Sequence, residues 1–277
     1  MNSPDKPTQS KKTIHCFFSG GRDSAVACFI AKKLADAKGW KYNLVNIDTT
    51  ISIKQTKRYI EEYAKWLDTN LIIIRPKETF KELAAKRGMW PSLNPNNHRW
   101  CYFDLKLKPT IKYLKENYKP NDIVILGIRK WESRKRKELY KNTFFIKDYN
   151  GIKTLVWLPL LHVDDQTLEK LIVKFNIPRN PVWKFGFSGE CLCLAGTPEM
   201  TIGIIFRNFP EETQELLEID RIINKNRKSK KPSAPPSIFR KGFKTLEEYY
   251  NYTKLQTQLD MFIYPYGLKS CQGTCML

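Results

Sequence analysis

A short run of small and polar residues, Ser19 to Ser24, has the composition of an anion-binding loop. Gly20 and Gly21 lack a Cβ atom, so backbone N–H groups there can approach a phosphate closely, and the serine hydroxyls add further donors. The run lies between an apolar stretch and an Ala-rich pattern typical of a helix, whose positive end would face the same point. It is not a P-loop, because no second Gly-Lys pair follows at that spacing. Taken alone, the run fits either a phosphate cradle or an ordinary capped helix after a glycine turn.

A second run of charged residues, Gly127 to Arg136, also follows an apolar stretch. Arg129 would lie at the carboxyl end of a strand, where ligands of open α/β sheets bind, and its guanidinium can hold two phosphate or sulfate oxygens at once. Arg136 is a candidate second clamp, and Glu132 could orient either arginine. The alternative is that the run forms only a solvated helix face.

Strand-like and helix-like segments alternate around these two runs. Apolar stretches predict strands at residues 14–18, 42–47, 71–74, 122–127 and 156–161. Amphipathic patterns predict helices from the first loop to residue 37 and at residues 54–67, 79–86, 103–117 and 164–175, the last with Asp164 near its N-cap. Strands that alternate with helices imply a parallel sheet covered on both faces. The predicted fold is therefore α/β, with a doubly wound, mostly parallel sheet and a small helical C-terminal extension.

We expect three parts along the chain. Residues 1–12 are polar and are interpreted as a flexible leader, and residues 13–196 as the α/β domain. Residues 197–277 form a C-terminal part with helical patterns at residues 198–223 and 246–261 and a cysteine-bearing tail. Residues 221–244, the basic arm, carry nine Lys and Arg, no acidic residue and three prolines. We interpret the centre of this arm as a linker or an exposed segment.

The composition excludes some classes of protein. With 42% hydrophobic and 13% aromatic residues among 277, the chain has too much apolar side chain to be disordered. No apolar run reaches the length of a bilayer span, and no secretory signal is visible, so we expect no membrane association. The 48 Lys and Arg against 28 Asp and Glu favour polyanionic ligands, although a solvated lysine-rich surface explains part of the excess. Seven cysteines indicate a reducing compartment, the cytoplasm, and two of them, Cys16 and Cys28, fall in apolar patterns and are interpreted as core.

Three segments resemble the motifs of one enzyme family. Ser-Gly-Gly-Arg-Asp-Ser at residues 19–24 resembles the PP-loop of the adenine-nucleotide α-hydrolase superfamily. Residues 127–136 are similar to the G-x-R-x-x-E-S-x-x-R motif of its phosphoadenosine phosphosulfate (PAPS) reductase family, and residues 99–109 to that family's C-C-x-x-L-K-x-x-P segment. The resemblance covers about residues 13–196. It implies the fold of that superfamily and an adenine nucleotide, ATP or PAPS, as ligand.

The resemblance also implies roles for the residues that match these motifs. Asp23 would place Mg²⁺, and Arg129 and Arg136 would stabilise the charge that develops on the leaving group. Asp48-Thr49-Thr50 resembles the family's D-T-G beside the nucleotide, with Thr50 in place of the glycine that permits close backbone approach. The residues implied in nucleotide binding are Ser19, Gly20, Gly21, Arg22, Asp23, Ser24, Asp48, Gly127 and Arg129.

The remaining cysteines form a second group. Cys191 and Cys193 lie in a glycine-bounded segment that resembles the cysteine-bearing segment of cluster-carrying relatives, although those generally show C-x-x-C and this chain has C-x-C. Cys101 would supply a third thiolate, and Cys271 or Cys275 a fourth. Thiolate sets of this kind hold iron–sulfur clusters or zinc, so a [4Fe–4S] cluster, zinc and plain thiols are the alternatives.

Three functions are compatible with these features. The intact loop resembles that of ATP-cleaving members, which favours adenylation with pyrophosphate release, linked to sulfur transfer from a thiol or persulfide donor. Cys271 or Cys275 is placed like the nucleophilic cysteine of PAPS reductases, which favours reduction of PAPS or adenylylsulfate. The basic arm, with Phe239 and Phe243, favours binding of tRNA or DNA, either beside an enzymatic activity or in a protein whose nucleotide pocket is vestigial.

Overall fold

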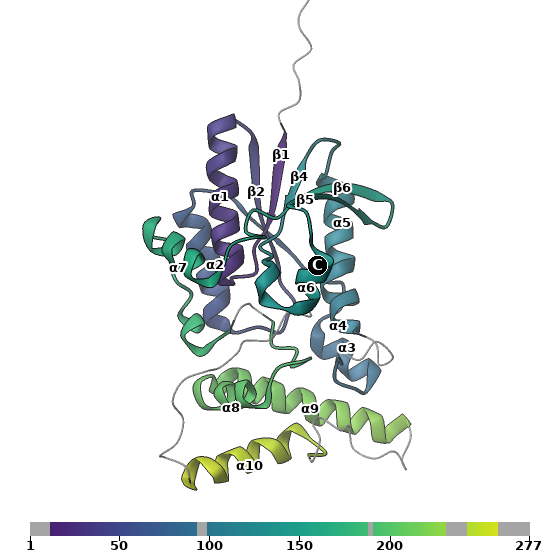
Figure 1. Ribbon diagram of the computed structural model, residues 1–277. Helices are drawn as coiled ribbons and strands as arrows, with labels where there is room; N and C mark the ends of the chain where they lie inside the picture. The colour runs from purple at the N-terminus through teal and green to yellow at the C-terminus, as the bar shows by residue number, and fades with distance from the viewer. Residues whose placement is uncertain (1–11, 93–98, 188–190, 231–242, 260–277) are drawn as a thin grey trace, which may run out of the picture.

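One six-stranded sheet forms the centre of the protein (Figure 1). The computed structural model describes residues 12–92, 99–187, 191–230 and 243–259. The strand order is β3-β2-β1-β4-β6-β5, and every neighbouring pair is parallel except β5 and β6. The strands are β1 (Thr13–Phe17), β2 (Lys41–Ile47), β3 (Leu71–Ile74), β4 (Ile123–Ile125), β5 (Phe144–Tyr149) and β6 (Ile152–Trp157). The predicted doubly wound, mostly parallel α/β fold is confirmed.

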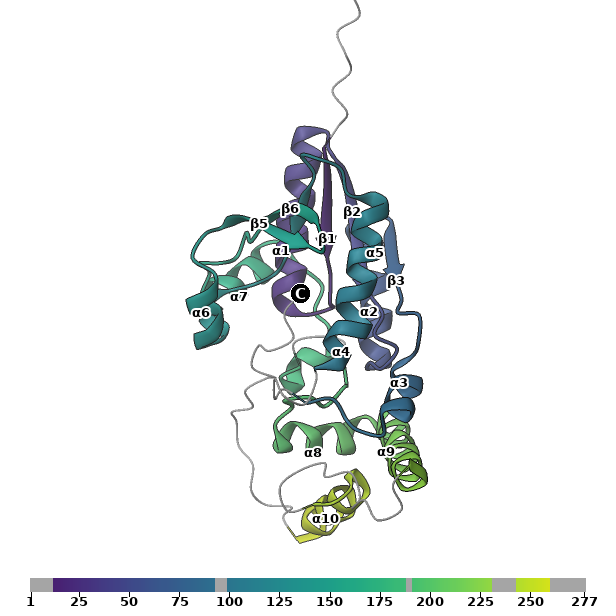
Figure 2. The same ribbon diagram turned by 90° about the vertical axis from the view of Figure 1, so that its right-hand side faces the viewer.

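Helices cover both faces of the sheet. Helices α1 (Arg22–Lys38), α2 (Lys54–Trp66) and α7 (Asp165–Lys174) share a hydrophobic cluster with one face of β1, represented by Ile14 and Cys16. Helix α5 (Lys108–Asn117) packs on the opposite face with Phe17. Figure 2 shows α1 and α5 on opposite sides of β1. Cys16 and Cys28 are fully buried between the sheet and α1, so their interpretation as core is confirmed.

The elements after β3 and β4, and a turn after α7, complete the α/β part. Helix α3 (Phe80–Arg87) starts with a Thr79 cap, and the short α4 (Trp100–Tyr102) continues through a π-helical turn at Phe103–Leu107 into α5. A 3-10 turn at Lys130–Glu132 and α6 (Arg134–Leu139) follow β4. A second 3-10 turn, Pro181–Phe185, lies after α7.

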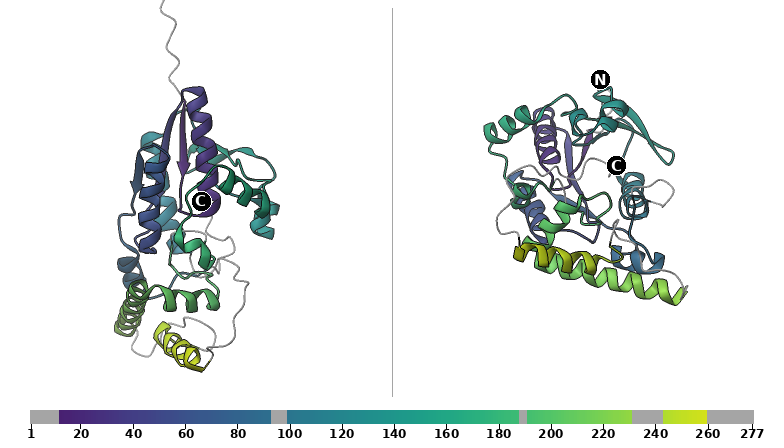
Figure 3. Two further views of the ribbon diagram at one scale, coloured as in Figure 1. Left: turned by 90° about the vertical axis from the view of Figure 1, so that its left-hand side faces the viewer. Right: turned by 60° about the horizontal axis from the view of Figure 1, so that its bottom comes forward.

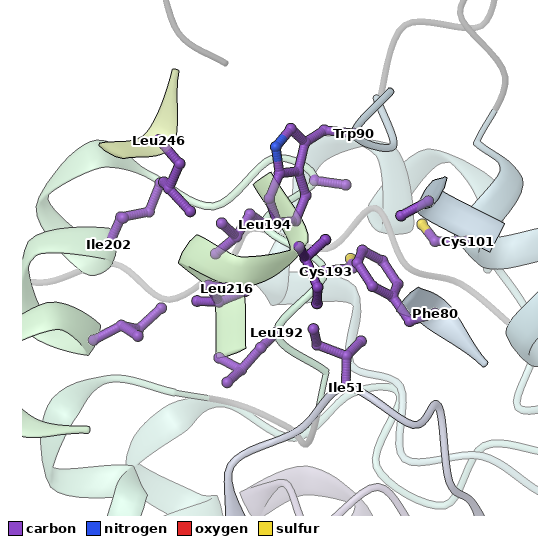
Figure 4. Close-up of a cluster of buried hydrophobic side chains, with 14 of the residues drawn as sticks. Ile51, Phe80, Trp90, Cys101, Leu192, Cys193, Leu194, Ile202, Leu216 and Leu246 are labelled. Carbon is purple, nitrogen blue, oxygen red and sulfur yellow. The ribbon is translucent and has the colours of Figure 1, made fainter. Parts of the chain in front are cut away.

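Three helices form a separate layer beyond the carboxyl ends of the strands. They are α8 (Glu199–Asn208), α9 (Pro210–Lys230) and α10 (Leu246–Leu259). Figure 3 shows α9 and α10 side by side under the sheet. Their apolar residues join a cluster with Ile51, Phe80 and Trp100 (Figure 4). Buried Asp220 accepts hydrogen bonds from Trp90 Nε1 at 2.7 Å and from Leu246 N at 3.0 Å, so this carboxylate links α9 to the start of α10 and to the α/β part.

Two expectations for the second half of the sheet were wrong. The last strand covers residues 152–157, and residues 158–161 form a turn after it. Strand β5 was missed, because its sequence Phe-Phe-Ile-Lys-Asp-Tyr alternates only weakly between apolar and polar residues. The Asn150-Gly151 turn that joins β5 to β6 carried the missing signal, since both residues have positive φ, at 56° and 89°, as tight hairpin turns require.

The helical pattern expected at residues 198–223 is confirmed. It forms two helices, because the chain turns at Phe209 and Pro210 starts α9. Residues 221–230 of the basic arm continue α9 as helix. The centre of the arm, residues 231–242, and the leader, residues 1–11, lie outside the described residues. In the parts of the chain that the structure describes, no helix has the length and apolarity needed to cross a membrane.

Candidate functional site

The sheet topology brings two loops to one point. Strand β1 pairs with β2 on one side and with β4 on the other. The chain adds β2 and β3 on one side of β1 and then crosses back to add β4 on the other side, so the order of the strands reverses between β1 and β4. Ligands of open α/β sheets bind at the carboxyl ends of the strands flanking such a switch point. The loop after β1 is Ser19–Gly21, and the loop after β4 contains Gly127 and Arg129.

Gly127 allows these two loops to touch. A Cβ atom built on Gly127 would lie 2.6 Å from both the backbone nitrogen and the Cα of Ser24. Any larger residue would therefore push the β4 loop away from the first turn of α1. The sequence implied a nucleotide contact for Gly127, and the structure gives it a close-packing role between the loops.

The first loop has the conformation that its glycines permit. Gly20 has a φ of 74°, and a Cβ atom there would lie 2.6 Å from Thr56 Cγ2. Gly21 is the N-cap of α1, and no side chain caps the helix there. Ser24 Oγ lies 2.9 Å from the Gly21 carbonyl oxygen, to which it donates, and 3.1 Å from exposed Ser19 Oγ. The positive end of α1 thus opens onto two hydroxyls, an arrangement suited to an anion.

Arg129 reaches from the second loop to the first. Its side chain is buried, at 3% exposure, and its Nε donates to Asp23 Oδ1 at 2.8 Å. Its Nη2 donates to Asp165 Oδ1 at 3.0 Å, and its Nη1 lies 3.4 Å from the Val163 carbonyl oxygen. A buried guanidinium in two ion pairs is fixed in direction, so its cation is positioned before any ligand arrives.

Asp165 joins the loops to α7. Its Oδ1 also accepts a hydrogen bond from Arg22 Nη2 at 2.8 Å, yet its side chain is 70% exposed. No pattern in the sequence singled out Asp165; its place in the first turn of a helix after the last strand was the one available signal. Because one exposed carboxylate holds two arginines that face the loop, an incoming anion would compete with Asp165 for both of them.

Glu132 contacts the two arginines of the second motif. Its Oε2 accepts a hydrogen bond from the Arg129 backbone N–H at 3.0 Å and forms an ion pair with Arg136. Ser133 Oγ caps α6 by accepting from the Arg136 backbone N–H at 3.2 Å. Glu132 therefore links Arg136 to the backbone of Arg129.

The charges of this site are close to balance. Burial raises the pKa of the Asp23 carboxyl above its ordinary value, while the positive charges of Arg129, Arg22 and Arg136 act against that rise. Three arginines thus face the carboxylates of Asp23, Asp165 and Glu132. If a phosphate displaced the exposed carboxylate of Asp165 from Arg22 and Arg129, one anion would replace another, and no buried charge would lose its partner.

Asp48 lies at the end of β2, and its carboxylate is occupied by the protein. Its Oδ1 accepts from the Thr50 N–H at 2.9 Å and lies 3.0 Å from Lys57 Nζ, while Arg75 Nε donates to Oδ2 at 3.0 Å. Burial acts to raise the pKa of Asp48, but these three donors outweigh it, and the pKa lies below its ordinary value. Asp48 acts in the structure as an anchor for the loop after β2.

Thr50, at the position of the glycine in the motif that residues 48–50 resemble, has a backbone conformation that favours glycine. Its φ is 62°, in the left-handed region, which costs a β-branched residue conformational energy. Its hydroxyl accepts a hydrogen bond from the Phe80 backbone N–H at 2.7 Å, at the start of α3. The substitution therefore keeps the turn and adds a contact between two loops.

Asn180 and Trp183, which follow α7, hold the loop after β1 in place. Asn180 Nδ2 and Trp183 Nε1 both donate to the Gly20 carbonyl oxygen, each at 3.0 Å. Asn180 is buried, and its amide also reaches Thr56 Oγ1 at 3.2 Å. Neither Asn180 nor Trp183 was a candidate site residue, and their role in positioning the loop was missed because the Asn180–Gly20 contact spans 160 residues.

The cysteine-bearing segment contacts the loop between β2 and α2. Cys191 forms a backbone bridge with Ser52, and Leu192 N donates to the Ile51 carbonyl oxygen at 3.0 Å. Cys101 and Cys193 are buried in one hydrophobic cluster, and Cys191 packs against it (Figure 4). The structure thus gathers three of the predicted thiolates around one cluster of side chains.

These cysteines do not form a metal site in the described part of the chain. Among the residues that the structure describes, no group of three or more His, Cys, Asp and Glu side chains is arranged to hold a metal ion. The predicted fourth ligands, Cys271 and Cys275, lie outside the described residues. The [4Fe–4S] cluster therefore stays a prediction, and no step of the chemistry below passes through it.

Comparison with known proteins gives one family. The family model of the phosphoadenosine phosphosulfate reductase domain matches residues 13–191. Two curated relatives come from Methanocaldococcus jannaschii. Uncharacterized protein MJ0066 is 30% identical over 209 residues, which cover 73% of this chain and 40% of the relative. Uncharacterized protein MJ0973 is 33% identical over 158 residues, which cover 53% and 36%. This chain thus spans about two fifths of the length of these relatives.

Similar solved structures include proteins of two yeasts. A phosphoadenylyl-sulfate reductase from Candida auris, in a phosphate complex, shows 22% identity and a TM-score of 0.49 over 64% of this chain and 79% of that one. A Candida glabrata FMN adenylyltransferase in complex with FAD and inorganic pyrophosphate shows 14% identity and a TM-score of 0.47 over 70% and 58%.

Proposed function

Because the chain belongs to the phosphoadenosine phosphosulfate reductase family, we propose that it is an enzyme that binds an adenine nucleotide between the loops after β1 and β4 and acts at its α-phosphate. The reaction that we propose is cleavage of ATP to pyrophosphate with transfer of the adenylyl group, linked to sulfur transfer. The proposed nucleotide-binding domain covers residues 13–196, and the proposed location is the cytoplasm.

The observation that carries this proposal is the position of Arg129. A buried guanidinium lies 2.8 Å from Asp23 in the first turn of α1, at the switch point of a parallel sheet. An ion pair with a purely structural role does not require an uncapped helix N-terminus beside it. The N-terminus of α1, which lies beside this ion pair, has no side-chain cap. Fixed cations beside a helix N-terminus that has no side-chain cap can stabilise negative charge on phosphate oxygens.

The residues present divide the work of the reaction. The first loop, with Ser19, Gly21 and Ser24, would bind the phosphates through N–H and hydroxyl groups. A nucleophile of the acceptor attacks the α-phosphorus, the bond to the bridging oxygen breaks, and pyrophosphate leaves with the electron pair. Arg129 and Arg136 stabilise the charge that grows on the leaving group.

Mg²⁺ fits this site as a companion of the nucleotide. In nucleotide sites the ion is held by one or two carboxylates together with substrate phosphates, so Asp23 satisfies the protein's share without a larger acidic group. Bound there, Mg²⁺ would neutralise charge on the phosphates. The proposed sulfur source is a thiol or persulfide donor.

Turnover of ATP tests the proposal. Anaerobically prepared protein is incubated with ATP and Mg²⁺, and pyrophosphate and AMP are followed. We expect release of pyrophosphate that is lost in Asp23→Ala and Arg129→Ala and kept in Asp36→Ala, whose carboxylate is exposed and pairs with Lys32 on the outer surface of α1. No cleavage by the wild-type protein in the presence of sulfur donors and candidate acceptors would overturn it.

The family also contains reductases, which makes reduction of PAPS or adenylylsulfate the second candidate. In that reaction the thiolate of Cys271 or Cys275 would attack the sulfur, the S–O bond would break, and the nucleotide would leave. A second thiol would then release sulfite and form a disulfide. Sulfite release from PAPS that is lost in Cys271→Ala or Cys275→Ala, without ATP cleavage, identifies this reaction.

The cysteines have a separate test. Cys101, Cys191 and Cys193 could hold a [4Fe–4S] cluster together with a cysteine of the tail. In that case anaerobically purified protein should be brown and contain iron and sulfide in equal amounts. Zinc without sulfide would identify the alternative metal. Protein that is free of metal and fully active would leave the three thiols as packing residues of the cluster in Figure 4.

A further inference from the structure

A basic surface with an exposed tryptophan lies directly beside Arg129. We define the α6 surface as Trp131, Arg134, Lys135, Lys137 and Lys141, all of them exposed. Figures 1 and 2 show α6 at the carboxyl ends of the strands, projecting from the side of the sheet. The sequence pointed only to the basic arm as a nucleic-acid contact and interpreted this run as phosphate clamps or a solvated helix face.

Trp131 is placed as a stacking platform. Its side chain is 52% exposed, although an indole of this size normally packs into a core. Lys130 Nζ lies 4.6 Å and Lys137 Nζ 5.6 Å from the centroid of its ring. Both ammonium groups lie over the ring, so a base that stacks on the indole would take the place of one of them and leave that cation to contact the neighbouring phosphate.

Acidic side chains of the described chain neutralise few of the positive charges on the α6 surface. Arg134 is 93% exposed and pairs with Glu138 one turn away, a contact that contributes little in water. Within the described chain, Lys135, Lys137 and Lys141 take part in no ion pair. The other acidic residue of the segment, Glu132, is already bound to Arg136. Repulsion among these cations is relieved by a polyanion.

The α6 surface is connected to the candidate nucleotide site through one carboxylate. Glu132 holds the Arg129 backbone N–H at 3.0 Å and pairs with Arg136 on α6. The charge of Arg136 also acts on the Asp23 carboxyl in the first turn of α1. A chain bound along α6 would therefore end beside the atoms where the proposed reaction takes place.

We propose that the α6 surface binds single-stranded nucleic acid, with a base stacked on Trp131 and phosphates on Arg134, Lys135 and Lys137. The inference rests on the proposed function, because it supplies the class of acceptor that the adenylylation requires. An unpaired strand is favoured over a duplex, since only an unstacked base offers its face to the indole. It is favoured over an acidic peptide, because carboxylates use the cations and leave the tryptophan unused.

The test measures binding and its salt dependence. The full chain is titrated with fluorescently labelled single-stranded RNA and DNA of equal length and with the corresponding duplex, over a series of salt concentrations. Trp131→Ala should weaken binding of the single strands by about fivefold or more. Lys135→Gln/Lys137→Gln should reduce the slope of log K against log salt by about 1.4, or about 0.7 for each phosphate contact.

Two matched variants serve as controls. Lys112→Gln/Lys115→Gln removes two exposed cations from α5, and Trp66→Ala removes a half-exposed tryptophan from α2; both should bind as the wild-type protein does. The basic arm is present in every variant, so a difference between them reports the α6 surface alone. A preference between RNA and DNA identifies the acceptor.

Several outcomes would overturn the inference. These are wild-type binding by Trp131→Ala, equal losses in the α5 control, tighter binding of the duplex, or equal displacement of the strand by polyglutamate. Cleavage of ATP in the absence of nucleic acid should be unchanged in Trp131→Ala. If that cleavage is absent from the wild-type protein while the strand binds as described, the proposed function fails and the α6 surface stands.

Discussion

Each end of β1 carries a cluster of polar and charged side chains around a buried titratable or charged residue, His15 at one end and Arg129 at the other. At the amino end, His15 and Asp122 lie with Tyr113 and Asn43. At the carboxyl end, Arg129 lies with Asp23 and Asp165. Burial and altered pKa values occur in both clusters, so these properties alone do not separate a structural network from a functional site.

The amino-end cluster is closed. His15 is fully buried, its Nδ1 lies 2.9 Å from the Tyr113 hydroxyl, and its Nε2 lies 3.4 Å from Asp122 Oδ2. A proton on Nε2 satisfies both contacts. Asp122 also accepts from the backbone N–H groups of Thr13 and Lys119, each at 2.8 Å. Every member is bound to another part of the fold, and the cluster fixes the start of β1.

The carboxyl-end cluster is open. Asp165, which holds Arg22 and Arg129, is mostly exposed, and the neighbouring N-terminus of α1 has no side-chain cap. A ligand can therefore exchange with an exposed partner of a buried cation. The comparison indicates that the functional site of this protein is distinguished by a buried charged side chain whose ion-pair partner is exposed to solvent.

The largest expected effect is that of Arg129→Ala on nucleotide affinity. Loss of the cation should weaken binding of ATP or PAPS by about 1.5–3 kcal/mol, because a charge-assisted contact to phosphate is lost. Calorimetric titration measures this effect. Arg179→Ala removes an exposed arginine that pairs with Glu169 on α7 and should leave the affinity unchanged. Wild-type affinity in Arg129→Ala would make the carboxyl-end cluster as structural as the other one.

Asp122→Ala should change stability and leave nucleotide affinity unchanged. The substitution leaves the Thr13 and Lys119 N–H groups and the His15 ring without their acceptor, which should lower the free energy of unfolding by about 1–3 kcal/mol. Urea denaturation and nucleotide titration of the same preparation give the two values. A loss of affinity in protein that is still folded would contradict the division between the clusters.

His15 should make stability depend on pH. Burial lowers its pKa below the ordinary value of 6.5, although Asp122 acts in the opposite direction. The unfolded chain then binds the proton more readily than the native one, so this contribution is complete above pH 6.5 and is lost as the pH falls towards the native pKa. The slope has an upper limit of about 1.4 kcal/mol per pH unit. Unfolding free energies at pH 7.5 and 5.5 should differ less in His15→Gln than in the wild-type protein; equal differences would remove His15 from the explanation.

The smallest expected effect is a gain from Asp165→Asn. Neutralising the exposed carboxylate removes the anion that competes with phosphate for Arg22 and Arg129, so nucleotide affinity should rise by up to about fivefold, the scale of an exposed ion pair. The same titration measures it, with Asp164→Asn at the adjacent cap of α7 as control. A weaker affinity in Asp165→Asn would instead show that the carboxylate positions Arg129 for the ligand.

Local patterns predicted most of the α/β part. Strand β3 was predicted at its exact bounds and α2 within one residue, because apolar periods of two and 3.6 residues report burial directly. The segment Ser19–Ser24 and Arg129 were singled out for their residue types and their place after predicted strands, and the resemblance to the family's motifs favoured the phosphate-binding interpretation. Strand β5 was missed because its exposed positions include the apolar residues Phe144 and Ile146, so apolar and polar residues do not alternate along it.

Contacts between distant segments could not be predicted. Asn180 and Trp183 hold the loop after β1 from 160 and 163 residues away. Asp165 contacts Arg129 across 36 residues and Arg22 across 143. Each of the three looks ordinary within its own helix or turn. Thr50 looked like a departure from the glycine of the motif, yet the turn tolerates it because its hydroxyl bonds to Phe80 N.

The sequence by itself determined the fold class, the two loops and the cations that face them, because these follow from local periodicity and from residue chemistry. Tertiary structure alone decided which carboxylates hold Arg129, that Asp48 is an anchor, and that the Trp131 ring is exposed with Lys130 and Lys137 over it. The physical reason is that ion pairs and hydrogen bonds depend on distances of about 3 Å between side chains, and the chain sets such distances only when the helices have packed on the sheet.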